Sequence, residues 1–193
     1  MAKKQVSRKK KKGNNHIKSQ AAQIPDKKSN RKRAFLFITL FILQIILFYV
    51  IYGNQWFERH LFFPLANTYA YLSGKILYLT GYSNFVAGDI ISSGTSLSVS
   101  IKKGCDAAEP MAIFVAAVIA FPATYKSKFA GLLFGIPILF LLNIVRVFTL
   151  FIAGVHYPDF FETMHLAVWQ VLFIIFAIML WVLWIKLMVK KTT

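Results

Sequence analysis

The stretch FAGLLFGIPILFLLNIVRVFTLFI, residues 129–152, decides the fold class, because it is an apolar run with a single charge, Arg146, near its end. As a helix it is about 36 Å long, enough to cross the roughly 30 Å hydrocarbon core of a bilayer. An arginine inside such a span costs about 3 kcal/mol on insertion scales and marks a functional site by default. The run therefore predicts a membrane-spanning helix and makes Arg146 the first candidate site residue.

The composition of the whole chain points to the same class. Of its 193 residues, 57% are hydrophobic, which predicts an integral membrane protein. Thirteen of the 23 Lys and Arg residues fall within residues 1–33, beside one acid, Asp26. We interpret this segment as a disordered basic cytoplasmic tail that is attracted to anionic lipid headgroups. It has no interleaved aromatic residues, so we expect no nucleic-acid partner.

Four apolar segments predict a four-span helical bundle, an all-α integral membrane fold with both termini in the cytoplasm. The loop that carries Lys126 and Lys128 is basic and therefore internal, whereas residues 154–163 contain two acids and no Lys or Arg and are therefore external. This topology makes residues 53–106 external and residues 188–193 a second cytoplasmic tail. The predicted spans are residues 34–52, 107–124, 129–152 and 166–187.

The external segment is expected to hold two further elements. Residues 61–81 are apolar but interrupted by Pro64 and Lys75, which predicts an interfacial or re-entrant helix. Residues 96–102 alternate polar and apolar side chains, which is the period of a strand. With a preceding strand over residues 89–93 and a turn at Gly94, they predict a small external β-hairpin that leads directly to the only cysteine, Cys105.

The predicted topology brings three reactive side chains to the external ends of three spans: Cys105, Arg146 and His165. A thiolate is the reactive form of cysteine, and a helix N-terminus and nearby cations favour it. His165 would serve as general base and then general acid, while Arg146 would stabilise charge in a tetrahedral intermediate. Asn143 lies on the same helical face as Arg146 and is expected to support it. Asp106 and Glu109, which follow Cys105 in the sequence, are further candidates for a supporting role. The sequence has no metal-ligand spacing and no phosphate loop, so we expect no metal and no cofactor.

Each candidate has a simpler alternative. Arg146 could form a structural ion pair with Asp106 or Glu109, and Glu109 could instead shape the electrostatics of a helix start. Cys105 could be a small buried side chain, and His156 competes with His165 for a functional role. These alternatives stay open at the level of sequence.

The pattern resembles the exosortase/archaeosortase family of membrane cysteine transpeptidases, over roughly residues 34–187. The residues that carry the resemblance are Gly104-Cys105-Asp106-Ala107-Ala108-Glu109, Asn143-Ile144-Val145-Arg146 and His165. The small size is similar to the compact bacterial subtypes, such as the exosortase H group. The sequence departs from the family in one place: members often carry glycine two positions after the cysteine, where this chain has Ala107.

The resemblance implies that Cys105, His165 and Arg146 are catalytic, as nucleophile, acid/base and third essential member. It implies a cysteine transpeptidase of the bacterial inner membrane whose site faces the periplasm. Its substrates would be secreted proteins with a C-terminal sorting signal, made of a short motif, a transmembrane helix and a basic tail. The enzyme would pass the acyl group through a thioester to an acceptor nucleophile that the sequence does not identify.

Two other functions compete with this hypothesis. A non-enzymatic polytopic protein, such as a small transporter subunit or an assembly scaffold, would use Arg146 as a solute or ion-pair site. A membrane-tethered binder of nucleic acid or lipid would depend on residues 1–33 instead. Substitution of Cys105 should inactivate an enzyme but not the non-enzymatic protein. Deletion of residues 1–33 should abolish the function of the membrane-tethered binder.

Overall fold

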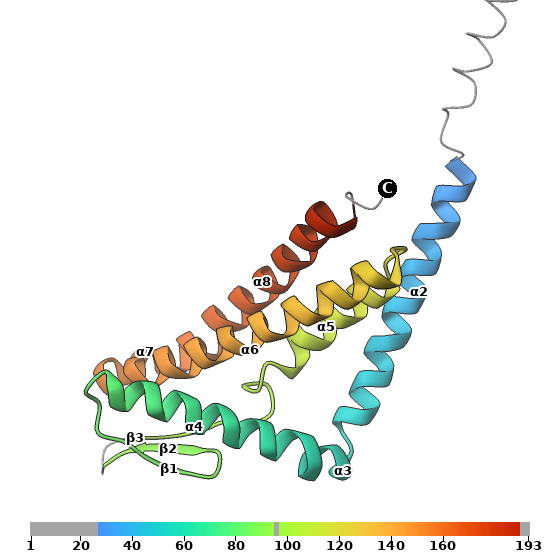
Figure 1. The fold of residues 1–193 in the computed structure, drawn as a ribbon. Helices are drawn as coiled ribbons and strands as arrows, with labels where there is room; N and C mark the ends of the chain where they lie inside the picture. The colour runs from blue at the N-terminus through green and yellow to red at the C-terminus, as the bar shows by residue number, and fades with distance from the viewer. Residues whose placement is uncertain (1–26, 95–96, 190–193) are drawn as a thin grey trace, which may run out of the picture. The chain divides into compact units, whose positions relative to one another are not determined.

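The long apolar runs of the sequence form helices in the computed structural model of the protein (Figure 1). The structure describes residues 27–94 and 97–189. They divide into a short unit that ends at Ile38 and a larger unit that begins at Thr39, and every contact described below lies within the larger unit. The helices are α2 (Lys27–Tyr52), α3 (Gln55–Phe57), α4 (Phe63–Leu79), α5 (Ala108–Ala120), α6 (Tyr125–His156), α7 (Pro158–Thr163) and α8 (Trp169–Trp184), with π-helical turns η1 (Glu58–Phe62), η2 (Met164–Val168) and η3 (Ile185–Val189).

Within the described residues, three helices are long and apolar enough to cross a membrane: Arg31–Tyr52, Tyr125–His156 and Pro158–Val189. The predicted second span, residues 107–124, is occupied by α5, which has only 13 residues. At about 20 Å, α5 is shorter than the hydrocarbon core. It ends because Phe121 is extended, the conformation favoured by a residue before a proline. The fold is a multi-pass helical membrane protein, and the fourth span stays a prediction.

The spanning helices are longer than the sequence predicted. Helix α6 begins at Tyr125, so the expected basic turn is its first turn, and the Thr124 hydroxyl caps it by accepting a hydrogen bond from the Ser127 amide at 3.4 Å. The last helix begins at Pro158, a residue type that suits a first helical position. Helix α2 begins at Lys27, so the end of the predicted basic tail is helical, and residues 1–26 lie outside the described residues.

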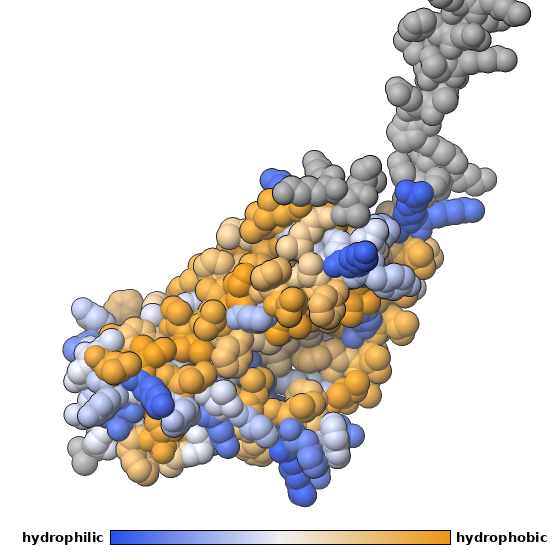
Figure 2. Space-filling model, in the orientation of Figure 1, coloured by the Kyte–Doolittle hydropathy of each residue, from blue (hydrophilic) through white to orange (hydrophobic). Residues whose placement is uncertain are grey.

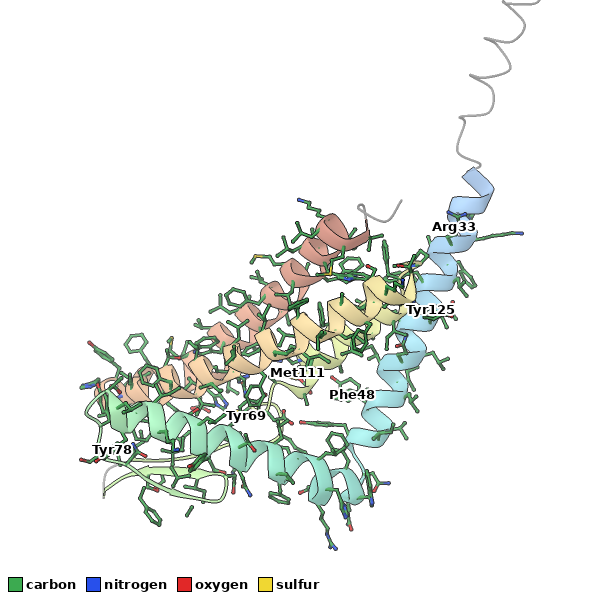
Figure 3. The ribbon with its side chains drawn as sticks, viewed as in Figure 1. Arg33, Phe48, Tyr69, Tyr78, Met111 and Tyr125 are labelled. Atoms are coloured by element: carbon green, nitrogen blue, oxygen red, sulfur yellow. The ribbon has the colours of Figure 1, made fainter. Side chains whose placement is uncertain are left out.

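The segment predicted to be interfacial or re-entrant is helical as far as Leu79 and is not among the helices of spanning length and apolarity. Its buried side chains recur every three or four residues, which gives α4 one face that packs against α6. These buried residues are Phe62, Ala66, Tyr69, Ala70, Ser73 and Leu77. Tyr69 points from α4 toward α6 and stacks on Phe140 at 4.7 Å between ring centroids (Figure 3).

The segment predicted to be external folds into a three-stranded antiparallel sheet rather than the predicted hairpin. Its strands are β1 (Phe85–Ala87), β2 (Ile90–Ser93) and β3 (Leu97–Ser100), in that order across the sheet. Strand β1 escaped prediction because three residues are too few to show alternation. A two-residue connection joins it to β2, and there Gly88 has a φ of 61°, as tight hairpin turns require. The sheet lies against α4 (Figure 1).

Helices α5, α6 and α8 lie side by side and share a second core built around Phe114, Leu139 and Phe173 (Figure 1). Two glycines of α6 allow this close approach: a Cβ on Gly135 would overlap the Phe114 ring, and a Cβ on Gly131 would overlap Trp184. The opposite face of α8 exposes large apolar side chains, and Figure 2 shows hydrophobic residues over α6 and α8. An apolar exterior of this kind fits contact with lipid.

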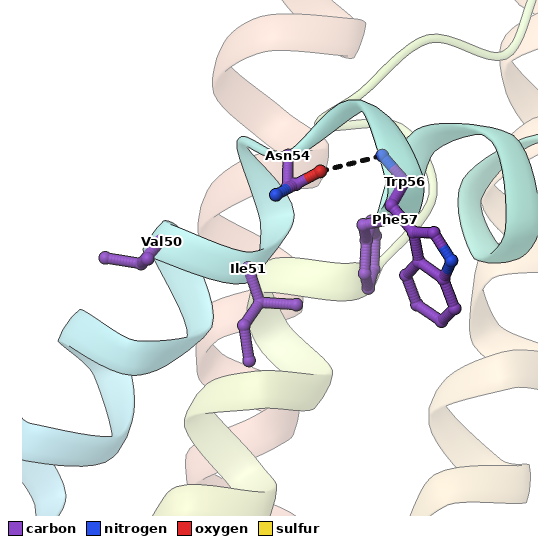
Figure 4. Close-up of a pocket in the computed structure, with 5 residues that line it drawn as sticks. All are labelled: Val50, Ile51, Asn54, Trp56 and Phe57. Carbon is purple, nitrogen blue, oxygen red and sulfur yellow. Dashed lines mark hydrogen bonds between the residues drawn. The ribbon is translucent and has the colours of Figure 1, made fainter.

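The connection between α2 and α3 is fixed by a side-chain cap. The Asn54 carboxamide oxygen accepts a hydrogen bond from the Trp56 amide at 2.8 Å (Figure 4). The turn encloses a small apolar pocket of about 280 Å³ lined by Val50, Ile51 and Phe57 as well. The cap directs the chain from α2 into α4 and thereby fixes the end of α2, where Tyr52 lies.

Substitution of Gly135 by alanine tests the close packing of α5 on α6. The added methyl group would overlap Phe114, so we expect a loss of about 1–3 kcal/mol in unfolding free energy, although alanine favours helix by about 1 kcal/mol. Leu133→Ala, on an exposed side of α6, is the control and should change stability by less than about 0.5 kcal/mol. Unfolding in detergent micelles measures both, and a Gly135→Ala protein as stable as the wild type would contradict the packing.

Candidate active site

The candidate site is built on the loop that joins β3 to α5, residues 101–107. Ile101 is buried and anchors the loop to the core at its start. The Cys105 amide donates a hydrogen bond to the Lys102 carbonyl at 2.8 Å, and Gly104 has a φ of 90°, which a residue without Cβ adopts at little cost. The loop therefore turns sharply and presents the Cys105 side chain beside the first turn of α5.

The cysteine and the predicted histidine meet although 60 residues separate them in the chain. The Cys105 Sγ atom contacts the Nε2 atom of His165, which lies in the π-helical turn η2. The Phe161 ring packs beside the imidazole with centroids 5.9 Å apart. Cys105 is partly buried, so the sulfur is sheltered and yet reachable.

Arg146 lies in α6 and joins the other two segments through its guanidinium. It donates to the Gly104 carbonyl at 3.2 Å and to the His165 carbonyl at 3.5 Å, and its Nη2 atom is 3.8 Å from the Cys105 sulfur. The side chain is only 2% exposed. Its Nε atom has no hydrogen-bond partner within the described part of the chain. The three segments of the site therefore meet at one buried cation.

The supporting residues predicted from the sequence divide into two groups. Asn143 is fully buried, and its side-chain amide donates to the Cys105 carbonyl at 3.0 Å. Asp106 is 1% exposed and accepts a hydrogen bond from the Ala108 amide. Glu109 faces another way: its carboxylate accepts a hydrogen bond from Tyr49 at 3.4 Å.

Two of the alternatives considered from the sequence concern Arg146 and His156. In residues 27–94 and 97–189, no carboxylate lies within ion-pair distance of Arg146, and the ion pair formed there joins Lys103 to Glu58 at 2.8 Å. The competing histidine, His156, bonds to the Tyr82 hydroxyl at 2.9 Å. Arg146 is therefore held by backbone carbonyls of the cysteine and histidine segments, and His156 belongs to a different cluster.

Tyr52, at the end of α2, holds the cysteine loop in a way that the sequence did not reveal. Its hydroxyl lies 3.2 and 3.3 Å from the two carboxylate oxygens of Asp106, to which it donates, and it accepts from the Gly104 amide at 3.2 Å. The Lys103 ammonium also donates to the Tyr52 carbonyl at 3.4 Å. A tyrosine at the end of a span reads as an interface anchor, so only the three-dimensional contacts identify this role.

Ala107 adopts a left-handed backbone conformation, with a φ of 56°, just before α5. This conformation costs an ordinary L-residue about 1–2 kcal/mol and costs glycine little. It is the position at which the sequence departs from the glycine expected by resemblance. Alanine in place of glycine at this position therefore strains the backbone of the loop that carries Cys105.

The charges around the sulfur act in opposite directions. Burial raises the pKa of the Cys105 thiol, Arg146 lowers it, and Asp106 raises it, with the net pKa above its ordinary value. Burial also raises the pKa of the Asp106 carboxyl. Because the resting thiol is protonated at neutral pH, the sulfur needs a base to become a nucleophile. His165 Nε2 is the base in contact with it.

The comparisons with known proteins agree with a multi-pass membrane protein. The family model described as transmembrane exosortase (Exosortase_EpsH) matches residues 30–183. The chain therefore belongs to the transmembrane exosortase family, whose members are generally cysteine transpeptidases. No curated protein and no solved structure matches it. Among the residues that the structure describes, no group of three His, Cys, Asp or Glu side chains is placed to hold a metal.

Substitution of Ala107 by glycine is expected to stabilise the protein. The left-handed φ of Ala107 is strained for alanine, so its relief should raise the unfolding free energy by about 1 kcal/mol. Ala108→Gly, within the first turn of α5, is the matched control and should destabilise by about the same amount. Thermal unfolding in micelles measures both, and an Ala107→Gly variant less stable than the wild type would refute the strain.

Two substitutions should move the pKa of the Cys105 thiol in opposite directions. Arg146→Gln removes a charge that lowers this pKa, so the thiolate should form at higher pH. Asp106→Asn removes a charge that raises it, so the thiolate should form at lower pH. The pH dependence of alkylation by iodoacetamide measures the thiolate fraction, and Cys105 is the only cysteine that can react. Shifts of the same sign in both variants would argue against this electrostatic account.

Proposed function

We propose that this protein is a membrane-embedded cysteine transpeptidase that cleaves the C-terminal sorting signals of secreted proteins and transfers the acyl group to an acceptor. The observation that carries the proposal is the contact of Cys105 Sγ with His165 Nε2, with the Arg146 guanidinium 3.8 Å from the same sulfur. Acyl transfer requires a nucleophile, a base and a hydrogen-bond donor for the oxyanion, and here the base and the donor both lie beside the sulfur of the nucleophile. Family membership supports the same reaction class.

In the first half of the reaction, His165 Nε2 takes the thiol proton while the sulfur attacks the scissile carbonyl carbon. A carbon–sulfur bond forms, and the carbonyl electrons move onto the oxygen. Arg146 Nη2 is close enough to the sulfur to donate a hydrogen bond to this oxyanion. The imidazolium then returns the proton to the leaving amine as the carbon–nitrogen bond breaks. The product is a thioester on Cys105 and a released C-terminal fragment.

In the second half, an acceptor nucleophile attacks the thioester and His165 takes its proton. The tetrahedral intermediate collapses, the carbon–sulfur bond breaks, and the proton passes back to the sulfur. Burial raises the pKa of the thiol and so favours its protonated form. The reaction therefore ends with Cys105 as the protonated thiol with which it started. Water as acceptor would give hydrolysis, and an amine or a lipid group would give transfer.

We also propose the membrane orientation of the enzyme and its partners. The site faces the periplasmic side of a bacterial inner membrane, and both termini are cytoplasmic. This orientation is favoured by the clustering of Lys and Arg in residues 1–33. The partners are secreted precursors with a short motif, a transmembrane helix and a basic tail, together with anionic lipid at the basic N-terminal segment.

Processing of a tagged precursor tests the proposed reaction. The reporter ends in the C-terminal segment of a secreted protein from the same genome that carries such a signal. Cys105→Ala and His165→Ala should leave it at full length. Arg146→Lys, which keeps the charge but loses the guanidinium fork, should slow its processing by about 10²–10³-fold.

His156→Ala is the matched control, because this histidine bonds to Tyr82 and not to the sulfur. Its processing rate should stay close to that of the wild type. Normal processing by Cys105→Ala would reject the enzyme. An uptake or assembly defect in Arg146→Ala with no effect of Cys105→Ala would favour the non-enzymatic alternative.

A further inference from the structure

Among residues 27–94 and 97–189, no strand pairs with the outer edge of β3, which lies beside the sulfur. The strand order β1-β2-β3 places it at the margin of the sheet, and the register pairs Ile91 with Val99 and Ile90 with Ser100. The Ile101 amide donates to the Asp89 carbonyl at 3.0 Å. In an antiparallel ladder the bonded residues alternate, so Val99 faces β2 and the backbone groups of Ser98 and Ser100 face away from it.

A pocket of about 290 Å³ lies along this edge and continues to the sulfur. One wall is formed by β3 and the residues that follow it, from Ser98 to Lys102. The other wall comes from α6 and α7, with Leu150 and Phe161. Cys105, Arg146 and His165 also line it. The free backbone groups of Ser98 and Ser100 and the candidate nucleophile thus belong to one cavity.

Strand β3 itself carries neither of the residue types, lysine and proline, that commonly prevent strand pairing at an edge. Proteins commonly protect an edge with lysine, proline or a covering segment. Strand β3 has the sequence Leu-Ser-Val-Ser, without charge or proline, and Ser98 is exposed. Its apolar side chains, Leu97 and Val99, pack into the core. An uncharged edge open to a cavity is a template for an extended peptide.

We infer that β3 binds the substrate as an added strand, which places the scissile carbonyl at Cys105. The inference rests on the proposed function, since it supplies the substrate of that reaction. Strand β3 runs toward Cys105 in the amino-to-carboxyl direction. A substrate segment that runs in the same direction to a scissile carbonyl at the sulfur therefore lies parallel to β3. The bound segment is therefore the extended peptide on the amino side of the scissile bond, held by the outward backbone groups of Ser98 and Ser100.

In this binding mode, backbone groups align the substrate, so few side-chain contacts are needed. Backbone hydrogen bonds to a strand do not depend on the side chains of the peptide, so they supply alignment. The side chains of a paired strand alternate between two faces. Every second side chain of the bound segment then faces Leu150 and Phe161, and these two residues would limit the size of the side chain that fits there.

Disulfide trapping tests the binding mode without any turnover. Cys105→Ala removes the only cysteine, and Ser98→Cys adds one at the edge. The probe is the tagged reporter precursor with single cysteines placed in turn along the residues before and after its processing point. We expect cross-links at every second position on the amino side of the processing point. Cross-links at no position, at consecutive positions, or only on the carboxyl side would overturn the inference.

A backbone substitution supplies a kinetic test with the intact nucleophile. Ser98→Pro removes the outward N–H, and proline is tolerated at a sheet edge, whereas Ser98→Ala removes the hydroxyl and keeps the N–H. Reporter processing by the proline variant should be about five- to tenfold slower than by the alanine variant. Equal rates would overturn the role of the backbone. Unchanged alkylation of Cys105 in the proline variant shows that the site is intact.

The two tests separate this inference from the proposed reaction. Equal processing of the reporter with and without Cys105 would reject the proposed function, whatever the cross-links show. Cross-links without the alternating pattern, in a protein whose processing depends on Cys105, would reject strand addition and leave the reaction standing.

Discussion

The site depends on one buried cation that holds three chain segments together. Arg146 donates to the carbonyl of Gly104 and to the carbonyl of His165, and it also lies beside the cysteine sulfur. A charge removed from water is costly unless it is well satisfied by hydrogen bonds. The guanidinium provides five donors in a fixed fork, so it can join two carbonyls and still offer a donor at the sulfur. The hydrogen bonds to the two carbonyls offset part of the cost of burying Arg146 and also assemble the site.

The cysteine loop adds a second constraint, because its backbone conformation is unusual at two positions. Gly104 and Ala107 both have positive φ values, and the hydroxyl of Tyr52 spans the loop between Gly104 and Asp106. Local strain of this kind is found where surrounding structure holds it in place. Tyr52 from α2 and Asn143 from α6 supply that support on the two sides of Cys105. Their contacts fix the sulfur in one position next to the imidazole.

Much of the site followed from the sequence because the membrane makes polar residues informative. An arginine within an apolar run is costly and therefore indicates a function. The positive-inside rule predicted that Cys105 and His165 lie at a similar depth to Arg146. Tyr52 could not be found in this way, since a tyrosine at a span end is ordinary. Strand β1 was too short to show periodicity, and the end of α5 was set by Pro122 rather than by the extent of the apolar run. Glu109 was considered both as an ion-pair partner of Arg146 and as a charge at a helix start, and its carboxylate accepts a hydrogen bond from Tyr49.

The proposed mechanism requires that Cys105 carries the acyl group from the precursor to the acceptor. Mass spectrometry of the protein after brief incubation with the reporter precursor tests it directly. We expect an adduct on Cys105 with the mass of the amino-side fragment, and hydroxylamine should release it, as it releases a thioester. Cleavage of the reporter with no such adduct, or an adduct that persists in hydroxylamine, would contradict it.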